Sequence, residues 1–295
     1  MPRPWDVKGD ALPRDAAVSD HAKLRGAASW ADCVPSAPAA LAKGAVFRVD
    51  ASGALFRYAG KTSGGLAAPC KVGSGWRDML HISRQGGTLV AVDEAGDLWG
   101  YPADPATGRY SGSTRVKAGS GLKGADDVLT PGDTDGDGNP DLLVRQGGKL
   151  WRHSGTATGG YRPTGIQVDP PGVGKSWGDY NILIAAGDFA RDGATDPVRP
   201  DLIGRDSAGD LWLHKGNGAG GYAPRVRIGN GWQTYTALAA PGDLDGDSHP
   251  DLVGRDLVTG KDYGNLWFYK GNGAGGYAPR QKIGNGYPTA DEHLF

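Results

Sequence analysis

The chain has 295 residues, of which 32 are basic and 33 acidic, and its formal net charge at pH 7 is −1. Such a balance gives no broad attraction for nucleic acid or anionic lipid, so we expect neither as a partner. Gly contributes 51 residues and Pro 20, yet 9 Trp and 11 Tyr remain for a core, which indicates a turn-dense globular protein. No apolar run reaches the roughly 18 residues of a membrane-spanning helix, so we expect no membrane span.

Residues 1–43 are rich in Pro and Ala and match no later part of the chain, which favours an extended N-terminal arm. Cys33 in this arm and Cys70 beyond it are the two cysteines of the sequence. We predict a disulfide between them that ties the arm to the first repeat and indicates a secreted, extracellular protein. The alternative is a pair of unrelated buried thiols. Met1 is followed by polar, Pro-rich sequence, so either the chain is cytosolic or its secretion signal has been removed, and the two cysteines favour the second reading.

From residue 44 onward, one pattern recurs five times, and each copy carries three short runs. The apolar runs are 45–50, 88–93, 141–146, 201–206 and 251–256. The aromatic runs are 54–58, 97–101, 149–153, 210–214 and 265–269. The closing runs are 71–76, 117–122, 173–177, 228–232 and 283–287. A fixed period of this kind is the signature of a repeat architecture.

Each run is short, rich in β-branched and aromatic residues and bounded by Gly, Asn, Asp or Pro, which predicts β-strands joined by turns. A further inner run precedes the apolar run in three copies, at 128–133, 182–188 and 237–243. No long segment has helical periodicity. The predicted fold is all-β, a β-propeller with five four-stranded blades. The blades are expected at 44–76, 77–122, 123–177, 178–232 and 233–287, with a closing strand in 288–295.

The first copy has no obvious inner run, whereas the chain continues beyond the fifth copy. A propeller is usually closed when one terminus completes the blade begun by the other, because this removes exposed sheet edges. We therefore predict that Glu292 to Phe295 form the inner strand of the first blade. Two alternatives stay open: residues 30–43 supply that strand, or the chain is part of a six- or seven-bladed protein.

Two acidic loops follow inner runs, DTDGDGNPD at 133–141 and DLDGDSHPD at 243–251. Oxygen ligands at alternate positions of a Gly-containing loop suit a hard cation with six to eight ligands, so we predict calcium. The alternative is a turn held by side-chain hydrogen bonds alone. A third loop, 187–201, is degenerate, because Ala190 stands in place of an acid. Whether it holds a cation through Asp188, Asp192 and Asp196 is left open. The predicted ligands are Asp133, Asp135, Asp137, Asn139, Asp141, Asp243, Asp245, Asp247, His249 and Asp251.

The pattern GDxDGDxxPDLxxRDxxGxLWxYxGNGxGGY resembles the FG-GAP or VCBS repeat, which also forms the propeller head of integrin α chains. The resemblance covers residues 44–287 and is strongest from 123 onward. It implies a propeller with calcium in some blades, an extracellular location and a ligand-binding or adhesive role. The five-bladed layout is also similar to that of tachylectin, a sugar-binding propeller.

Catalysis is not expected, since the sequence contains neither an HExxH nor a GxSxG motif. His153 and His214 stand where other copies have Tyr, and we interpret them as packing residues. The same holds for the tryptophans of the aromatic runs, Trp99, Trp151, Trp212 and Trp267, which we expect in the core between blades.

An aromatic plane beside an amide and a guanidinium is what a neutral sugar requires. We expect such groups to be more exposed in the turns and closing runs of the last two copies. The predicted carbohydrate-binding residues are Asn217, Tyr222, Arg225, Trp232, Asn272, Tyr277, Arg280 and Tyr287. Their repetition has a purely structural alternative, turn chemistry that every blade needs. The functional hypothesis is a non-catalytic, lectin-like protein with glycans as partners; the alternative is a protein-docking or adhesion module.

Overall fold

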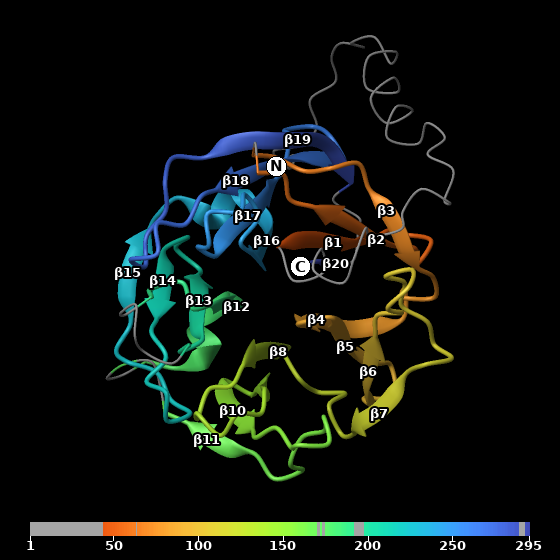
Figure 1. Ribbon diagram of the computed structural model, residues 1–295. Helices are drawn as coiled ribbons and strands as arrows, with labels where there is room; N and C mark the ends of the chain where they lie inside the picture. The colour runs from red at the N-terminus through yellow and green to blue at the C-terminus, as the bar shows by residue number, and fades with distance from the viewer. Residues whose placement is uncertain (1–43, 63, 170–171, 173–174, 192–197, 289–292) are drawn as a thin grey trace, which may run out of the picture.

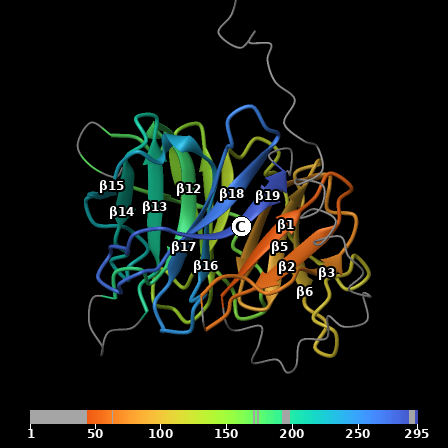
Figure 2. The ribbon, with the colours of Figure 1, turned by 90° about the horizontal axis from the view of Figure 1, so that it is seen from above.

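The computed structural model describes residues 44–62, 64–169, 172, 175–191, 198–288 and 293–295. Five four-stranded antiparallel sheets surround a central axis (Figure 1). Their strands run roughly along that axis, as the turned view in Figure 2 shows. The predicted fold class is confirmed. The chain is a five-bladed β-propeller.

Each blade consists of four strands that follow one another from the axis outward. Blade 1 contains β20 (His293–Leu294), β1 (Ala45–Val49), β2 (Leu55–Ala59) and β3 (Cys70–Gly73). Blade 2 contains β4 (Met79–Gln85), β5 (Thr88–Asp93), β6 (Leu98–Pro102) and β7 (Val116–Gly119). Blade 3 contains β8 (Asp127–Gly132), β9 (Asp141–Gln146), β10 (Lys149–His153) and β11 (Ile166–Val168). Blade 4 contains β12 (Tyr180–Gly187), β13 (Asp201–Asp206), β14 (Leu211–His214) and β15 (Val226–Gly229). Blade 5 contains β16 (Tyr235–Gly242), β17 (Asp251–Asp256), β18 (Tyr263–Tyr269) and β19 (Gln281–Pro288).

The C-terminal strand closes the ring as predicted. In the β20–β1 ladder, Leu294 is opposite Arg48. Phe47 and Phe295 exchange backbone hydrogen bonds of 2.7 and 3.1 Å. Their rings also stack, with centroids 5.5 Å apart. The two chain ends therefore share one sheet, which leaves the inner edge of β1 paired. Glu292 and the arm at 1–43, with Cys33, lie outside the described residues, so the Cys33–Cys70 bond stays a prediction.

Aromatic side chains fill the junctions between neighbouring blades. At four of the five junctions the last residue of a closing run packs against the last residue of the next aromatic run. The pairs are Trp76 with Tyr101 at 4.6 Å, Trp177 with His214 at 4.9 Å, Trp232 with Tyr269 at 4.4 Å, and Tyr287 with Tyr58 at 5.8 Å between ring centroids. His214 is therefore a packing residue, as its position in the repeat predicted.

A buried arginine on the second strand of a blade donates hydrogen bonds to backbone carbonyls near the start of the next blade. The Nη1 of Arg205 donates to the carbonyls of Trp232 at 3.0 Å and Tyr235 at 2.5 Å. Arg145 makes the same pair of bonds one blade earlier, and Arg255 donates to the carbonyl of Pro288 at 2.8 Å. Carbonyls at a blade junction would otherwise be buried without partners, so these arginines couple the blades.

Candidate functional site

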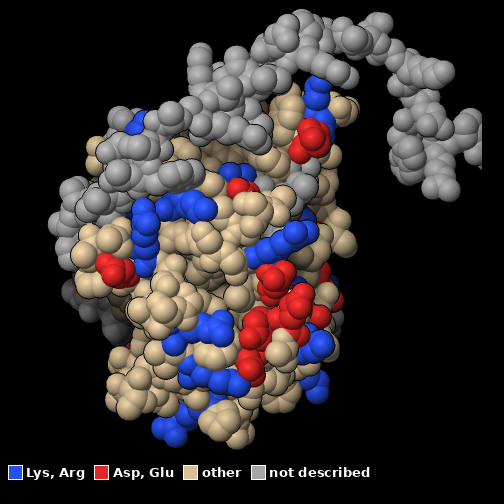
Figure 3. Space-filling model, turned by 90° about the vertical axis from the view of Figure 1, so that its right-hand side faces the viewer, with Lys and Arg blue, Asp and Glu red and all other residues tan. Residues whose placement is uncertain are grey.

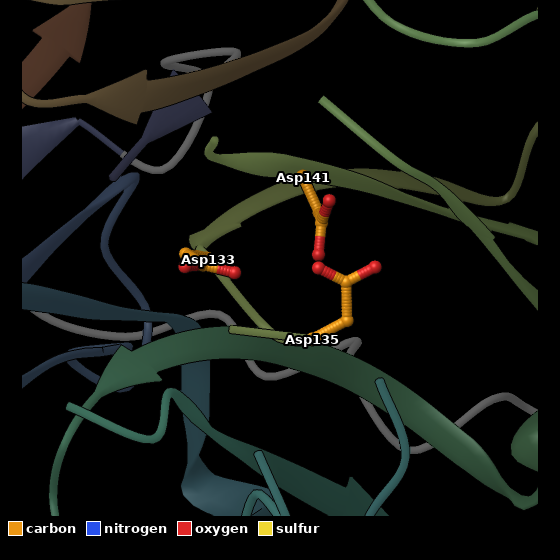
Figure 4. Close-up of side chains that lie close together, drawn as sticks. All are labelled: Asp133, Asp135 and Asp141. Carbon is orange, nitrogen blue, oxygen red and sulfur yellow. The ribbon is translucent and has the colours of Figure 1, made fainter. Parts of the chain in front are cut away.

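Each acidic loop follows an inner strand, β8 in blade 3 and β16 in blade 5. Ligand oxygens of Asp133, Asp135 and Asp141 lie within 4.8 Å of one another, as do those of Asp243, Asp245 and Asp247. Figure 4 shows the carboxylates of Asp135 and Asp141 turned toward each other. The structure thus brings together part of each predicted ligand set. The carboxylate of Asp137 instead accepts the side-chain and backbone N–H groups of Asn139, at 3.1 and 2.8 Å.

The last acid of each loop has a structural role. Asp251 is 0% exposed and accepts the N–H groups of Leu244 at 2.7 Å and Gly271 at 2.9 Å. Asp141 makes the matching bonds in blade 3, and so does Asp201 in blade 4, where the loop is degenerate. The degenerate copy therefore keeps the same two backbone hydrogen bonds. Burial, with Asp245 and Asp247 nearby, raises the pKa of Asp251 to about 6.

Basic side chains of the protein enter both acidic clusters. Lys270 Nζ lies 2.5 Å from Asp245 Oδ2 and 2.8 Å from Asp247 Oδ2. In blade 3, Arg152 pairs with Asp135 and lies 3.5 Å from Asp141. The hydrogen bonds to both carboxylates raise the pKa of Lys270. Repulsion between these neighbouring carboxylates is therefore offset within the chain.

The remaining predicted metal ligands serve the backbone of the loops. Asp133 accepts N–H groups of Gly136 and Gly138 at 2.7 and 2.8 Å, as Asp243 does for its own loop. The backbone N–H of His249 donates to Asp247 at 2.8 Å. In the degenerate loop, Asp192 and Asp196 lie outside the described residues.

Asn217 and Asn272 are exposed, as expected, but their side chains form turns. The Oδ1 of Asn217 accepts N–H groups of Ala219 at 2.8 Å and Gly221 at 3.0 Å. Asn272 repeats both bonds in blade 5. Each amide oxygen is thus engaged by its own hairpin, which is the structural alternative that the repeat left open.

The expectation that Trp232 and Tyr287 are exposed is wrong, since they are 3% and 6% exposed. Trp232 begins a 3-10 turn, Trp232–Thr234, and donates its indole N–H to the hydroxyl of Tyr277 at 3.0 Å. Tyr222 takes the place of Tyr277 in the preceding junction, with its ring 6.0 Å from that of Trp177. The closing runs face the next blade, so neither Trp232 nor Tyr287 presents a face to a ligand.

Arg225 and Arg280 lie over tryptophans of the aromatic runs. Three blades repeat one arrangement, in which a guanidinium covers an indole whose N–H donates to an aspartate. The guanidinium carbons of Arg115, Arg225 and Arg280 are 3.9, 3.8 and 4.1 Å from the ring centroids of Trp99, Trp212 and Trp267. The indole N–H groups donate to Asp93, Asp206 and Asp256 at 2.8, 2.8 and 2.6 Å. We call Trp99, Trp212 and Trp267 the capped tryptophans; all three are half-buried.

A cavity of 410 Å³ follows the ring axis, lined by residues of all five inner strands. Much of its wall is aliphatic, and its polar lining includes Asp127 and Asn181. Arg145 donates to Asp127, and Arg205 Nε donates to Asn181 Oδ1 at 2.8 Å. These polar groups thus take part in the coupling of the blades.

The face drawn in Figure 3 carries basic and acidic side chains in small neighbouring groups, and neither sign covers it. This distribution agrees with the net charge of −1. Among the described residues, no helix is long and apolar enough to cross a membrane.

No family model matches the chain, and no curated protein matches it. Among solved structures, it is similar to an Agrocybe aegerita lectin described as recognising non-reducing terminal N-acetylglucosamine, with 17% identity and a TM-score of 0.42. That match covers 79% of this chain and 61% of the lectin. AofleA from Arthrobotrys oligospora shares 12% identity at a TM-score of 0.42, covering 82% of this chain and 72% of that one. Human WBSCR16 shares 11% identity at a TM-score of 0.33, and the match covers 73% of this chain and 56% of that one. Similarity at this level carries no argument about function.

Proposed function

We propose that this propeller is a non-catalytic carbohydrate-binding protein. The observation that carries the proposal is the threefold repetition of the capped tryptophans on blades 2, 4 and 5. Each places a half-buried indole, on the third strand of a blade, beside a guanidinium, and Arg115 and Arg280 are exposed. Apolar C–H groups of a sugar can contact the indole edge while its hydroxyls accept from the guanidinium. Three such sites on one ring would bind a dense glycan surface by avidity.

The test is a glycan array read with the parent protein and with a triple variant, Arg115→Ala, Arg225→Ala and Arg280→Ala. We expect the parent to bind and the triple variant to lose most of the signal, because each site loses its hydroxyl donors. Lys61→Ala, at an exposed position outside these sites, is the matched control and should bind as the parent does. A parent that binds no glycan would refute the proposal.

A protein-docking module is the second candidate function, and one observation favours it. The outer strands of three blades carry an exposed aliphatic residue at equivalent positions: Val116 is 65% exposed, Ile166 57% and Val226 52%. Exposed aliphatic side chains on edge strands suit contact with another chain. Capture of a protein at one-to-one stoichiometry, with no glycan bound, would establish this candidate in place of the first.

We further propose that both acidic loops hold calcium and that the protein is secreted. The donor sets Asp133, Asp135, Asp141 and Asp243, Asp245, Asp247 consist of oxygens, which fits a hard cation. Calcium would supply charge neutralisation there, and Arg152 and Lys270 would have to leave the carboxylates. A cation bound only by the folded state adds about 2.7 kcal/mol at a hundredfold excess over Kd, so chelation should lower Tm.

The number of calcium ions bound per molecule, measured in variants of each loop, tests the sites one by one. Asp135→Ala and Asp245→Ala should each remove one equivalent, whereas Asp192→Ala should change the count little. Unchanged counts in the first two variants would reject the calcium sites and leave the carbohydrate proposal standing.

A further inference from the structure

Trp151 of blade 3 stands at the same repeat position as the capped tryptophans but has none of their contacts. Trp99, Trp212 and Trp267 each pack against a hydrophobic cluster, donate to an aspartate and lie under an arginine. Within the described part of the chain, the Trp151 indole has no hydrogen bond or ring contact, and neither cluster of blade 3 includes it. Trp151 is half-buried, as the capped tryptophans are, but none of their contacts accounts for its position.

Two substitutions in the repeat explain the missing cap. Gln146 ends β9 where Asp206 ends β13, so a neutral amide stands in place of the carboxylate that accepts the indole N–H. Gly165 directly precedes Ile166, which pairs with Arg152 as Val226 pairs with Leu213. By this register, Gly165 takes the place of Arg225, so blade 3 has no arginine at the position from which Arg225 covers Trp212. The neighbouring blade also contributes less bulk, because its closing run ends in Leu122 where three others end in Trp.

Polar groups flank the uncapped indole on the same face of the sheet. Gln167 is exposed and lies directly opposite Trp151 in the ladder between β10 and β11. In blade 4 that place holds Arg227, which forms an ion pair with Asp210 at 2.6 Å. In blade 3, Lys149 takes the place of Asp210 and Gln167 takes the place of Arg227. These two side chains cannot form an ion pair.

His153 lies two residues along β10 and therefore shares the face of Trp151. Its Nδ1 is 2.9 Å from the carbonyl oxygen of Arg162, so Nδ1 carries the proton and donates. In the neutral ring, Nε2 is then an acceptor. An indole plane, an amide and an imidazole acceptor together form a surface with one apolar face and directional polar groups.

We propose that Trp151 is the stacking platform of a single carbohydrate subsite on blade 3, which takes the apolar C–H face of a neutral pyranose. Gln167 and His153 bind its hydroxyls. The subsite rests on the proposed carbohydrate function but differs from the three capped positions, because no arginine of the described chain lies over its indole. One molecule therefore has one such subsite among its described blades, whereas the capped arrangement occurs three times.

The experiment uses full-length protein labelled with ¹⁵N at tryptophan, and it follows the indole N–H signals in NMR spectra. The probes are methyl β-glucopyranoside, methyl β-galactopyranoside, N-acetylglucosamine and, as an acidic sugar, glucuronate. The signal that disappears in Trp151→Phe identifies Trp151. We expect this signal to shift saturably with at least one neutral probe and less with glucuronate.

Two variants provide matched controls. Gln146→Asp combined with Gly165→Arg rebuilds the cap of blade 4 and should abolish the shift while the protein stays folded. A Cβ at residue 165 would lie 2.9 Å from Nε2 of His153 and 3.2 Å from Cβ of Trp151, so the His153 ring must shift to admit the new side chain. Trp212→Phe removes a capped tryptophan and should leave the Trp151 shift intact.

The outcomes separate the two proposals. If sugars bind on the array and move other indole signals but leave Trp151 unmoved, the subsite is refuted and the proposed function stands. If only glucuronate moves the Trp151 signal, the assignment to a neutral sugar is refuted. If the array is blank and no signal moves, the proposed function fails, and the subsite fails with it.

Discussion

His214 makes the stability of the ring depend on pH. It ends β14, is 0% exposed, and lies between the rings of Trp177 at 4.9 Å and Tyr180 at 5.3 Å. Within the described chain, neither of its ring nitrogens has a hydrogen-bond partner. Burial, and then the charge of Arg225, lowers its pKa from 6.5 to about 3. The folded protein therefore holds this histidine neutral across most of the acidic range.

The lowered pKa sets the sign and size of the effect. As pH falls below 6.5, His214 binds a proton in the unfolded chain but stays neutral in the folded chain. The free energy of unfolding therefore decreases progressively down to about pH 3. For one group, this linkage gives a loss of about 2 kcal/mol between about pH 7.5 and pH 5.

The substitution His214→Tyr should remove that loss. Tyr269 occupies the same position in blade 5, where its hydroxyl lies 2.6 Å from the hydroxyl of Tyr235. Tyr180 begins blade 4 as Tyr235 begins blade 5, so the new hydroxyl would have a partner. The variant should also gain stability at neutral pH, by about 1–3 kcal/mol, because it no longer buries unpaired ring nitrogens.

The assay is urea unfolding of parent and variant at about pH 7.5 and pH 5, with both free energies extrapolated to water. His153→Phe is the control, since it alters the same repeat position in blade 3 but keeps His214, and it should show the loss of the parent. Equal losses in the parent and in His214→Tyr would refute the reasoning, because His214 would then not be held neutral by the fold.

Three further predictions concern the ring itself. Deleting residues 293–295 should lower the Tm of the whole protein in one transition, since β20 completes blade 1; a Tm within about 2 °C of the parent would show that the strand is dispensable. Arg205→Gln should cost about 3 kcal/mol in urea unfolding, because buried carbonyls lose their donor, whereas the exposed Arg227→Gln should cost less than about 1 kcal/mol; equal costs would contradict the coupling role. Intact mass without reductant should be about 2 Da below the reduced mass if Cys33 and Cys70 are bonded, and two free thiols in secreted protein would disprove the bond.

The sequence alone was sufficient to predict the architecture, because each strand carries its own local signal. Short apolar runs between turn residues recur with a fixed period, and a repeated unit that cannot bury both faces alone must stack on its neighbours. The missing inner run of the first copy even predicted the closure by the C-terminal strand, which β20 confirms. The packing role of His214 followed from the same alignment.

The acidic loops were predictable only in part. Spacing within the loop places Asp133 and Asp135 together, since neighbouring residues of a tight turn must converge. The basic partners lie far along the chain, Arg152 in β10 and Lys270 directly after β18, and the sequence contains no local sign of that contact. Likewise, the bonds of Asp251 to Gly271 depend on how the loop meets a distant hairpin.

Exposure was decided by tertiary structure. Trp232 and Trp151 both stand in strand-and-turn segments with aromatic and polar neighbours, and local pattern does not separate them. Trp232 is buried because the next blade covers its face, while Trp151 has no cap because Gly165 and Gln146 stand where three other blades have arginine and aspartate. A side chain's own residue type and spacing determine the strand to which it belongs. Whether its face meets solvent or another blade depends on residues far away in the sequence, and only the register between strands brings them together.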